Sequence, residues 1–281
     1  MYSTRMEITF TKMHGLGNDF AVINALQQSF NLTSEQIKQL GDRHFGIGFD
    51  QMLVIEPPGS NGVDISYRIF NNDGGEVAQC GNGARCVAAY LYERGIVCKE
   101  EITARTLEGR LKLYRQPDGQ VRVNMGIPRL QPADIPFKAE QRAPVYSVLL
   151  DGKTITLSAV SMGNPHAIIE VSDVQSAPVT DMGPKLQQSV FFPDSVNVGF
   201  MQIMGPHRIR LRVYERGSGE TLACGSGACA AVVAGRILNK LDQEVKVTLP
   251  GGDLLVSWAG EGEPVWMTGP AVFVYDGRIT L

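Results

Sequence analysis

The sequence predicts an α/β protein made of two half-chains that share one fold. Two segments are copies of each other and align without a gap at an offset of 144 residues (224 − 80). The first copy runs from Arg68 to Ala84 and the second from Arg212 to Ala228, and both end in Cys-Gly-x-Gly-Ala before an apolar stretch. A repeat at about half the chain length indicates an internal duplication.

Two further features keep nearly the same offset. The turn Gly17-Asn18 recurs as Gly163-Asn164, 146 residues later (163 − 17). Gln51 stands before an apolar run, and Asn197 holds the matching place at the same offset of 146. Three features in one order favour two pseudo-symmetric halves over chance similarity between glycine-rich segments.

The bulk composition is that of a globular chain. It has 281 residues, of which 43% are hydrophobic and 20% charged. The net charge of −3, without a basic cluster, gives no electrostatic reason to expect nucleic acid or an anionic membrane as a partner. Five cysteines without a C-x-x-C pair, and no apolar signal segment at the N-terminus, predict a cytoplasmic protein with reduced thiols.

The first half reads as strands around two helices. A helix is predicted over 34–41, with Thr33 as its N-cap. A second is predicted over 81–94, because apolar residues recur there at spacings of three and four and Gly95 follows as a C-cap. The predicted strands, bounded by turn residues, are 8–13, 20–24, 51–56, 65–71, 102–106, 110–114 and 121–125.

Residues 126–144 contain four prolines and little periodicity, so we place the division between the halves there. The second half repeats the order, ending in a helix over 225–239 and strands over 245–249 and 254–258. A strand over 271–275 lies outside the second repeat and is predicted to complete the first half's sheet. The predicted domains are 1–125 with 270–281, which carries Cys80, and 126–269, which carries Cys224.

Cys80 and Cys224 each stand at the start of a predicted helix. The first N–H groups of a helix lack intrahelical partners and carry the positive end of its dipole. They can bind a carboxylate, and the neighbouring glycines let it approach the backbone. The same field lowers a thiol pKa, so that thiolate becomes accessible near neutral pH. Each loop therefore combines a carboxylate anchor with a candidate base.

Two such loops facing each other would place one sulfur on each face of a substrate α-carbon. One thiolate would remove the α-proton while the opposite thiol delivers a proton to the other face. Negative charge then grows on the carboxylate oxygens, where N–H donors stabilise the transition state. This stereoinversion does not strictly require a pyridoxal-type electron sink, so no cofactor is expected.

Other interpretations fit the residues less well. A cysteine–histidine hydrolase using His166 leaves one of the two thiols unexplained. A non-enzymatic anion-binding module would need the glycines but not both sulfurs. The run Gly225-Ser-Gly-Ala-Cys-Ala230 matches a dinucleotide fingerprint, which is weak evidence alone, and we expect no nucleotide site. The four histidines lack metal-ligand spacing, so no metal is expected. Small buried side chains are predicted at the other cysteines, Cys86, Cys98 and Cys229.

Five motifs resemble those of the diaminopimelate epimerases, along nearly the whole chain: Met13 to Phe20, Asn71 to Cys86, Gly163 to His166, Ser195 to Asn197, and Tyr214 to Gly227. The resemblance implies two halves, each a curled mixed β-sheet around a central helix, with the active site in the cleft between them. It also implies cofactor-independent epimerisation of LL-2,6-diaminopimelate to meso-2,6-diaminopimelate, in bacterial lysine and peptidoglycan precursor synthesis.

The resemblance further implies a set of site residues. Cys80 and Cys224 would be the acid/base pair, assisted by His166 and Glu215. Tyr275 would lie in a homodimer contact. The residues that would bind diaminopimelate are Asn18, Gln51, Asn71, Gly81, Asn82, Asn164, Asn197, Glu215, Arg216, Gly225 and Ser226.

One difference between the copies suits this substrate physically. Asn71-Asn72 in the first copy becomes Glu215-Arg216 in the second. A substrate with a distal amino-acid group needs a carboxylate and a cation, and Arg216 can bind a distal carboxylate bidentately. The alternative is an ordinary surface ion pair. Proline racemase-like enzymes also use two cysteines but would not need Glu215-Arg216, and phenazine-biosynthesis-like isomerases lack the cysteine pair.

Overall fold

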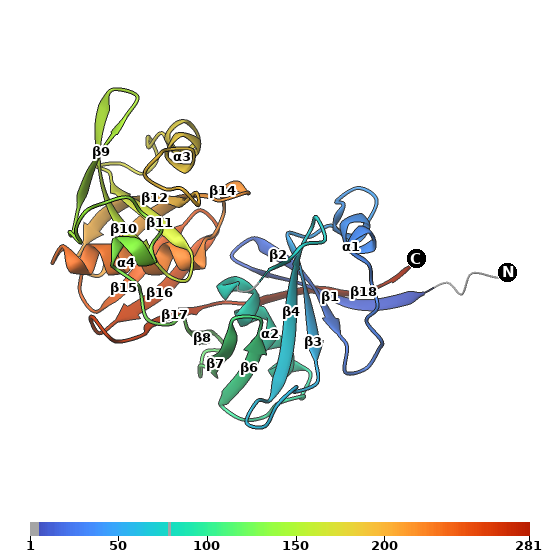
Figure 1. The fold of residues 1–281 in the computed structure, drawn as a ribbon. Coiled ribbons are helices and arrows are strands. Elements are labelled where there is room, and N and C mark those ends of the chain that lie inside the picture. The colour runs from blue at the N-terminus through green and yellow to red at the C-terminus, as the bar shows by residue number, and fades with distance from the viewer. Residues whose placement is uncertain (1–5, 78–79) are drawn as a thin grey trace. The chain divides into compact units, whose positions relative to one another are not determined.

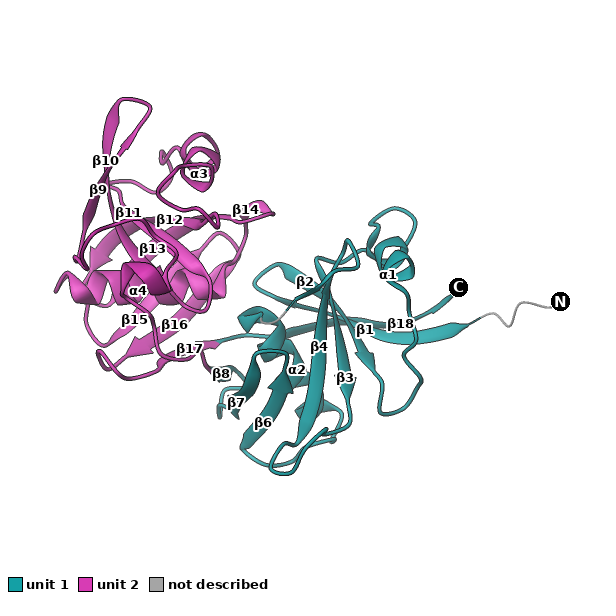
Figure 2. Ribbon diagram, viewed as in Figure 1, with its two compact units in different colours: residues 1–123, 269–281 teal, residues 124–268 magenta. Residues whose placement is uncertain are grey.

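The computed structural model describes residues 6–77 and 80–281, and the chain divides into two compact units (Figures 1 and 2). Unit 1 contains the residues up to Val123 together with Gly269–Leu281, and unit 2 is Asn124–Thr268. From the sequence we place the divisions between the predicted domains at 125/126 and 269/270.

The sheet of unit 1 is mixed. Its hydrogen-bonded order is β18, β1, β2, β3, β4, β6, β7, β8, with the short β5 paired to β4. Only the β2–β3 and β4–β6 pairs are parallel among these described strands. The bounds are β1 Glu7–Gly15, β2 Asn18–Asn24, β3 Gln51–Glu56, β4 Ile65–Asn71, β5 Glu76–Val77, β6 Glu101–Thr106, β7 Gly109–Arg115, β8 Val121–Asn124 and β18 Val272–Thr280.

The sheet of unit 2 repeats this topology. Its order is β9, β10, β11, β12, β13, β15, β16, β17, with β14 paired to β13 and with β11–β12 and β13–β15 parallel. Strand β18, from the end of the chain, therefore takes the place in unit 1 that β9 takes in unit 2. The bounds are β9 Tyr146–Leu150, β10 Lys153–Ser161, β11 Pro165–Glu170, β12 Asn197–Gly205, β13 Arg208–Glu215, β14 Gly219–Thr221, β15 Glu244–Leu249, β16 Gly252–Trp258 and β17 Val265–Gly269.

One buried helix belongs to each sheet: α2 (Gly81–Glu93) in unit 1 and α4 (Gly225–Ile237) in unit 2 (Figure 1). Every residue from Gly227 to Gly235 is buried. A helix that is apolar on all sides is stable only inside a core, and the sheet that curls around α4 supplies that core. The predicted α/β architecture of two like halves, each a curled mixed sheet around a helix, is confirmed.

The two smaller helices show what periodicity detects and what it misses. Helix α1 (Ser34–Gly41) has the predicted bounds, and Thr33 forms a capping box with Gln36. Helix α3 (Val179–Gln187) was not predicted, because Gly183 and Pro184 interrupt its apolar pattern. Its buried side chains, Val179 and Leu186, join the core of unit 2. A 3₁₀ turn, η1 (Pro132–Asp134), lies in the proline-rich segment 126–144.

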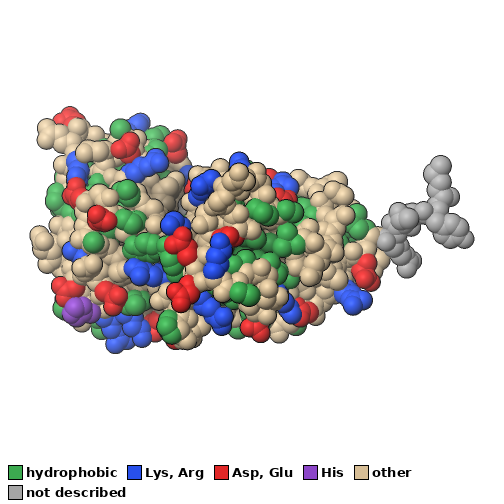
Figure 3. Space-filling view, turned by 90° about the horizontal axis from the view of Figure 1, so that it is seen from below, with side chains coloured by type: hydrophobic (Ala, Val, Ile, Leu, Met, Phe, Trp, Pro, Cys, Tyr) green, Lys and Arg blue, Asp and Glu red, His purple; other side chains and the backbone are tan. Residues whose placement is uncertain are grey.

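None of the helices in the described ranges is long and apolar enough to cross a membrane. Basic and acidic side chains are interspersed on the face shown in Figure 3, with apolar groups between them. That face carries no large area of a single charge sign, in keeping with the net charge of −3.

Gly183 offers a test of the packing of α3. A Cβ atom added there would overlap the ring of Tyr214. Gly183→Ala should therefore lower the free energy of unfolding by about 1–3 kcal/mol, although alanine favours helices. Thr180→Ala, at an exposed position of the same helix, should change it by less than about 0.5 kcal/mol. Urea denaturation measures both, and a Gly183→Ala protein as stable as the wild type would contradict the packing argument.

Candidate active site

Cys80 is the N-cap of α2, as predicted, with extended backbone angles of φ −148° and ψ 110°. Its sulfur accepts a hydrogen bond from the N–H of Gly83 at 3.4 Å, as a serine or asparagine side chain does at this position. A Cβ on Gly83 would lie 2.9 Å from Leu53 Cδ2. A larger residue here would therefore have to displace the end of the Leu53 side chain. We call residues 80–83 the Cys80 mouth.

Cys224 is the N-cap of α4, also as predicted, and it is buried. Its sulfur points to a carboxylate: the thiol donates to Glu215 Oε2 at 3.0 Å and lies 3.7 Å from Ser226 Oγ. A Cβ on Gly227 would lie 3.1 Å from this sulfur, so glycine again makes room for the packing beneath the helix. We call residues 224–227 the Cys224 mouth.

The protonation state of Cys224 differs from the sequence-based expectation. Burial in the core, together with the charge and hydrogen bond of Glu215, raises its pKa well above the usual value. These effects outweigh the helix N-terminus, which was predicted to lower it. Cys224 is therefore a thiol at neutral pH, and Glu215 holds its proton in a defined direction.

A duplicated ion pair stabilises the hairpin before each mouth. Arg68 and Glu76 form a bidentate pair with distances of 2.8 and 2.8 Å. Their copies Arg212 and Glu220 form the same pair at 2.6 and 2.9 Å. Bidentate pairing fixes both side chains in one geometry. The two copies thus share a structural brace as well as a cysteine.

In unit 1 the strand register gathers predicted site residues near the Cys80 mouth. Gln51 is opposite Asn71 in the β3–β4 pair, and its Nε2 donates to Asn71 Oδ1 at 2.9 Å. Asn18 Oδ1 accepts from Asn82 Nδ2 at 3.1 Å and lies 3.8 Å from the Cys80 sulfur. Gln51 Oε1 is buried and has no hydrogen-bond partner among the described residues. Such an acceptor suits a cationic ligand group.

Unit 2 has a corresponding group at the Cys224 mouth. Asn164 Nδ2 donates to Ser226 Oγ at 3.3 Å, and Asn164 Oδ1 lies 3.0 Å from His166 Nε2. His166 is fully buried and is opposite Asn197 in the parallel β11–β12 pair. Burial, and secondarily the charge of Arg216, lower the pKa of His166 to about 3. His166 is therefore a neutral imidazole whose Nε2–H can donate to Asn164.

Arg216 follows β13 directly and is held by its backbone. Its N–H donates to Asn197 Oδ1 at 2.9 Å, while Asn197 Nδ2 donates to Pro165 O at 3.1 Å. The guanidinium donates to Asp194 O at 2.9 Å. None of the ion pairs between described residues includes Arg216, so they give no support to the surface ion pair considered as an alternative.

Two residues that contact predicted site residues, Thr221 and Asp50, were not identified from the sequence. Thr221 donates to Glu215 Oε1 at 2.5 Å and so completes the Glu215–Cys224 contact. The copies differ at this point, with Val77 in place of Thr221, and that difference was the available signal. Asp50 accepts from Asn18 Nδ2 at 2.9 Å. Nothing in the repeat pattern marked Asp50.

The remaining predicted positions fall as follows. Gly81 and Gly225 are the first residues of α2 and α4. Cys86 and Cys229 are buried as predicted, but Cys98 is exposed, because it lies in the turn after α2 rather than in a packed element. Tyr275 is half exposed on β18.

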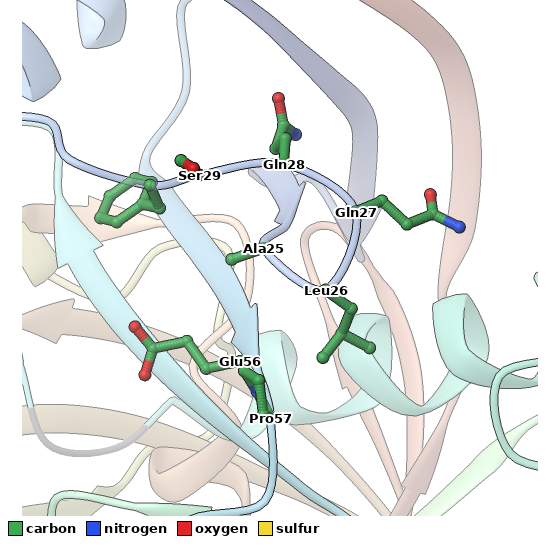
Figure 4. A pocket seen from close by; sticks show the side chains of 8 residues that line it. Ala25, Leu26, Gln27, Gln28, Ser29, Glu56 and Pro57 are labelled. Carbon is green, nitrogen blue, oxygen red and sulfur yellow. The ribbon is translucent and has the colours of Figure 1, made fainter.

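A surface hollow lies at the loop after β2 (Figure 4). It is lined by Ala25–Phe30, Glu56 and Pro57, and it contains none of the predicted site residues. Glu56 is the one ionisable side chain in this lining, and we assign the hollow no role. In the described part of the chain no cluster of three or more His, Cys, Asp or Glu side chains is arranged to hold a metal ion.

Comparison with known proteins agrees with the motifs. The family model described as diaminopimelate epimerase matches residues 10–131 and 158–274. The diaminopimelate epimerase of Nitrosospira multiformis is 54% identical over 276 residues, which are 98% of this chain and 99% of that protein.

Two solved structures show the same fold. A phenazine biosynthesis protein of the PhzF family from Bacillus anthracis has a TM-score of 0.71 at 16% identity and covers 98% of this chain and 100% of its own. A hydroxyproline epimerase from Agrobacterium vitis has a TM-score of 0.71 at 14% identity, covering 98% and 93%. At these identities the likeness concerns the fold alone. The sequence matches, together with the two N-cap cysteines, establish that the chain belongs to the diaminopimelate epimerase family.

Proposed function

We propose that this protein interconverts LL- and meso-2,6-diaminopimelate by a two-cysteine acid/base mechanism, in the cytoplasm of a bacterium that makes lysine and peptidoglycan precursors. The observation that carries the proposal is the repeated mouth: in each unit a cysteine is the N-cap of a buried helix. Family membership supplies the substrate.

Both sulfurs take part in the proton transfers. In one direction the Cys80 thiolate takes the α-proton, and the Cys224 thiol, which Glu215 holds protonated, gives its proton to the opposite face. The product leaves Cys80 as a thiol and Cys224 as a thiolate, which is the starting state for the reverse direction. The carbon's two bonding electrons stay on the substrate throughout, so no oxidant or reductant is needed.

The helix N-termini stabilise the intermediate. Removal of the α-proton moves negative charge onto the carboxylate oxygens, and the amides of Gly81, Asn82, Gly225 and Ser226 at the starts of α2 and α4 are donors of the required kind. Donors aimed at developing charge lower the barrier more than they stabilise bound substrate. The reaction therefore has a charge sink without pyridoxal chemistry, and we propose that it needs no cofactor.

The polar side chains bind the rest of the substrate. Arg216 is the cation for the distal carboxylate, and Gln51 Oε1 is a buried acceptor for an ammonium group. Glu215, considered from sequence for the distal ammonium, instead contacts Cys224, so its role is at the reacting centre. The other proposed binding residues are Asn18, Asn71, Asn164 and Asn197, with the neutral His166 orienting Asn164.

Under the two-base mechanism, changing one cysteine should leave proton transfer on only one face of the α-carbon. Cys80→Ala and Cys224→Ala should each abolish epimerisation, because one face of the α-carbon loses its proton donor or acceptor. Cys→Ser variants should retain slow exchange of the α-proton with solvent deuterium. Cys98→Ala, at the exposed cysteine, is the matched control and should keep wild-type rates. Full epimerase activity in either active-site alanine variant would refute the mechanism.

The distal-carboxylate role predicts a large effect at Arg216. Arg216→Met should lower kcat/KM for diaminopimelate at least about a hundredfold, because a charge-assisted contact is lost and the carboxylate is left unpaired. Lysine lacks that carboxylate, so any weak activity on lysine should change much less. Arg208→Met, at an exposed position of β13, is the control. Unchanged diaminopimelate kinetics in Arg216→Met would exclude the role.

We also propose that the protein is a homodimer that buries β18. Val272, Val274 and Tyr275 are 41%, 54% and 49% exposed on this strand, whose one described neighbour in the sheet is β1. The Tyr275 ring meets Phe10 edge to face, with centroids 5.9 Å apart, which holds an amphipathic aromatic at the surface. An apolar edge strand left in water is otherwise an aggregation hazard.

The dimer proposal is tested by analytical ultracentrifugation at micromolar concentration. The wild type should sediment as a dimer, and Tyr275→Asp should shift it to monomer, because a charge would be buried without a partner. Leu149→Asp, at an exposed position on the equivalent strand β9, should leave the dimer intact. A monomeric wild type would rule the dimer out.

A further inference from the structure

A directed chain of hydrogen bonds runs through the side chains at the Cys80 mouth. Arg85 Nη2 donates to Asn82 Oδ1 at 3.0 Å, and Asn82 Nδ2 donates to Asn18 Oδ1 at 3.1 Å. Asn18 Nδ2 in turn donates to Asp50 Oδ2 at 2.9 Å. The chain thus has a guanidinium at one end, a carboxylate at the other and two amides between them.

The chemistry of the two ends fixes the direction of both amides. An arginine can only donate, so Asn82 must turn its oxygen to Arg85 and its NH₂ to Asn18. A carboxylate can only accept, so Asn18 must turn its NH₂ to Asp50 and its oxygen inward. Arg85 and Asp50 therefore require the same donor-to-acceptor direction along this chain of hydrogen bonds. The amide orientation of Asn18, which is ambiguous for an isolated asparagine, is determined here.

The direction matters because of what else Asn18 faces. Its Oδ1 is also the atom 3.8 Å from the Cys80 sulfur, so the fixed amide presents an acceptor to the thiol. Asp50 is itself held by Arg43, whose Nη2 donates to Asp50 Oδ1 at 2.7 Å. Asp50 Oδ1 thus accepts from Arg43, and Oδ2 accepts from Asn18 Nδ2 and from the backbone N–H of Asp19 at 3.1 Å.

The second unit has the opposite arrangement. Asn164, the copy of Asn18, turns its NH₂ to the Cys224 mouth at Ser226 and its oxygen to His166. At the offset of 146, Asp50 corresponds to Val196, and His166 corresponds to Phe20. The residues that set the two amides are therefore the ones in which the copies differ. Asn18 thus presents its oxygen, an acceptor, to the Cys80 mouth, whereas Asn164 presents its NH₂, a donor, to the Cys224 mouth.

We propose that Asp50 is a positioning residue of the active site: it locks Asn18 with its oxygen toward Cys80 and Asn82, and so makes the Cys80 mouth chemically unlike the Cys224 mouth. Asp50 acts through Asn18 and does not touch substrate. The activity part of this inference rests on the proposed function, whereas the orientation part is a property of the protein alone.

The test is a cycle of four proteins: wild type, Asp50→Asn, Arg43→Met and the double variant. In Asp50→Asn the single amide oxygen can face either Arg43 or the donors on the other side, Asn18 Nδ2 and the Asp19 N–H. The charge-assisted hydrogen bond should turn this oxygen to Arg43, so that the new NH₂ faces Asn18. Asn18 must then flip and oppose Asn82. We expect kcat/KM for diaminopimelate to fall about tenfold or more, which corresponds to the loss of roughly one such hydrogen bond.

The double variant separates orientation from general stability. Arg43→Met alone leaves Asp50 a carboxylate and removes the pairs of Arg43 with Asp50 and Asp19. Asp19 keeps Lys12 as a partner, and the Arg43 side chain is half exposed, so kcat/KM should change by less than about threefold. In the double variant the amide oxygen introduced at position 50 is released from the arginine and can accept from Asn18, so kcat/KM should recover several-fold above Asp50→Asn. A purely structural role predicts a further loss instead, and that outcome would overturn the proposal.

A readout without substrate keeps the two proposals distinguishable. A flipped Asn18 would direct N–H toward the Cys80 sulfur and stabilise the reactive thiolate. Iodoacetamide at neutral pH, mapped by mass spectrometry, should therefore modify Cys80 several-fold faster in Asp50→Asn, with the exposed Cys98 as internal reference. Faster labelling in a protein that does not act on diaminopimelate would support the inference while refuting the function. Unchanged labelling would refute the inference whether or not the protein is an epimerase.

Discussion

A buried helix leaves its first-turn amides without intrahelical partners, and in both units of this protein the residue at that point, the N-cap, is a cysteine. The constraint is strong because α2 and α4 lie inside curled sheets, where an unpaired backbone N–H is costly. Both N-cap cysteines have extended backbone angles, but the Cys80 sulfur accepts from the Gly83 N–H, whereas the Cys224 thiol is turned to Glu215. The N-cap position therefore places a sulfur beside the first turn of a buried helix in each unit.

The surrounding elements serve that placement. The bidentate pairs Arg68–Glu76 and Arg212–Glu220 hold the hairpin that leads into each mouth. Gly83 and Gly227 let the helix start lie against the sheet, since a Cβ at either would press on Leu53 or on the Cys224 sulfur. From sequence these glycines were assigned to ligand approach. The structure adds a second reason for them, which is the close packing beneath each helix start.

The duplicated scaffold carries unequal chemistry. Glu215 and Thr221 hold Cys224 as a buried thiol, whereas Asn18 and Gly83 contact the sulfur of Cys80. The two-base reaction that we propose needs one base and one acid at any moment, and unequal surroundings of the two sulfurs suit that need. Duplication supplies equivalent positions for the sulfurs, and the differing side chains around them give each sulfur different hydrogen-bond partners.

The sequence by itself determined the duplication, the N-cap position of both cysteines, helix α1 with its N-cap Thr33, and family membership. These depend on residue identity at fixed spacing, which is a local property. Helix α3 was missed because the core of unit 2, rather than helix propensity, stabilises a segment that contains Gly183 and Pro184. The raised pKa of Cys224 and the contact between Asp50 and Asn18 were decided only by tertiary structure. Burial and hydrogen bonding between residues far apart in the chain set both, and neither leaves a periodic signal in the sequence.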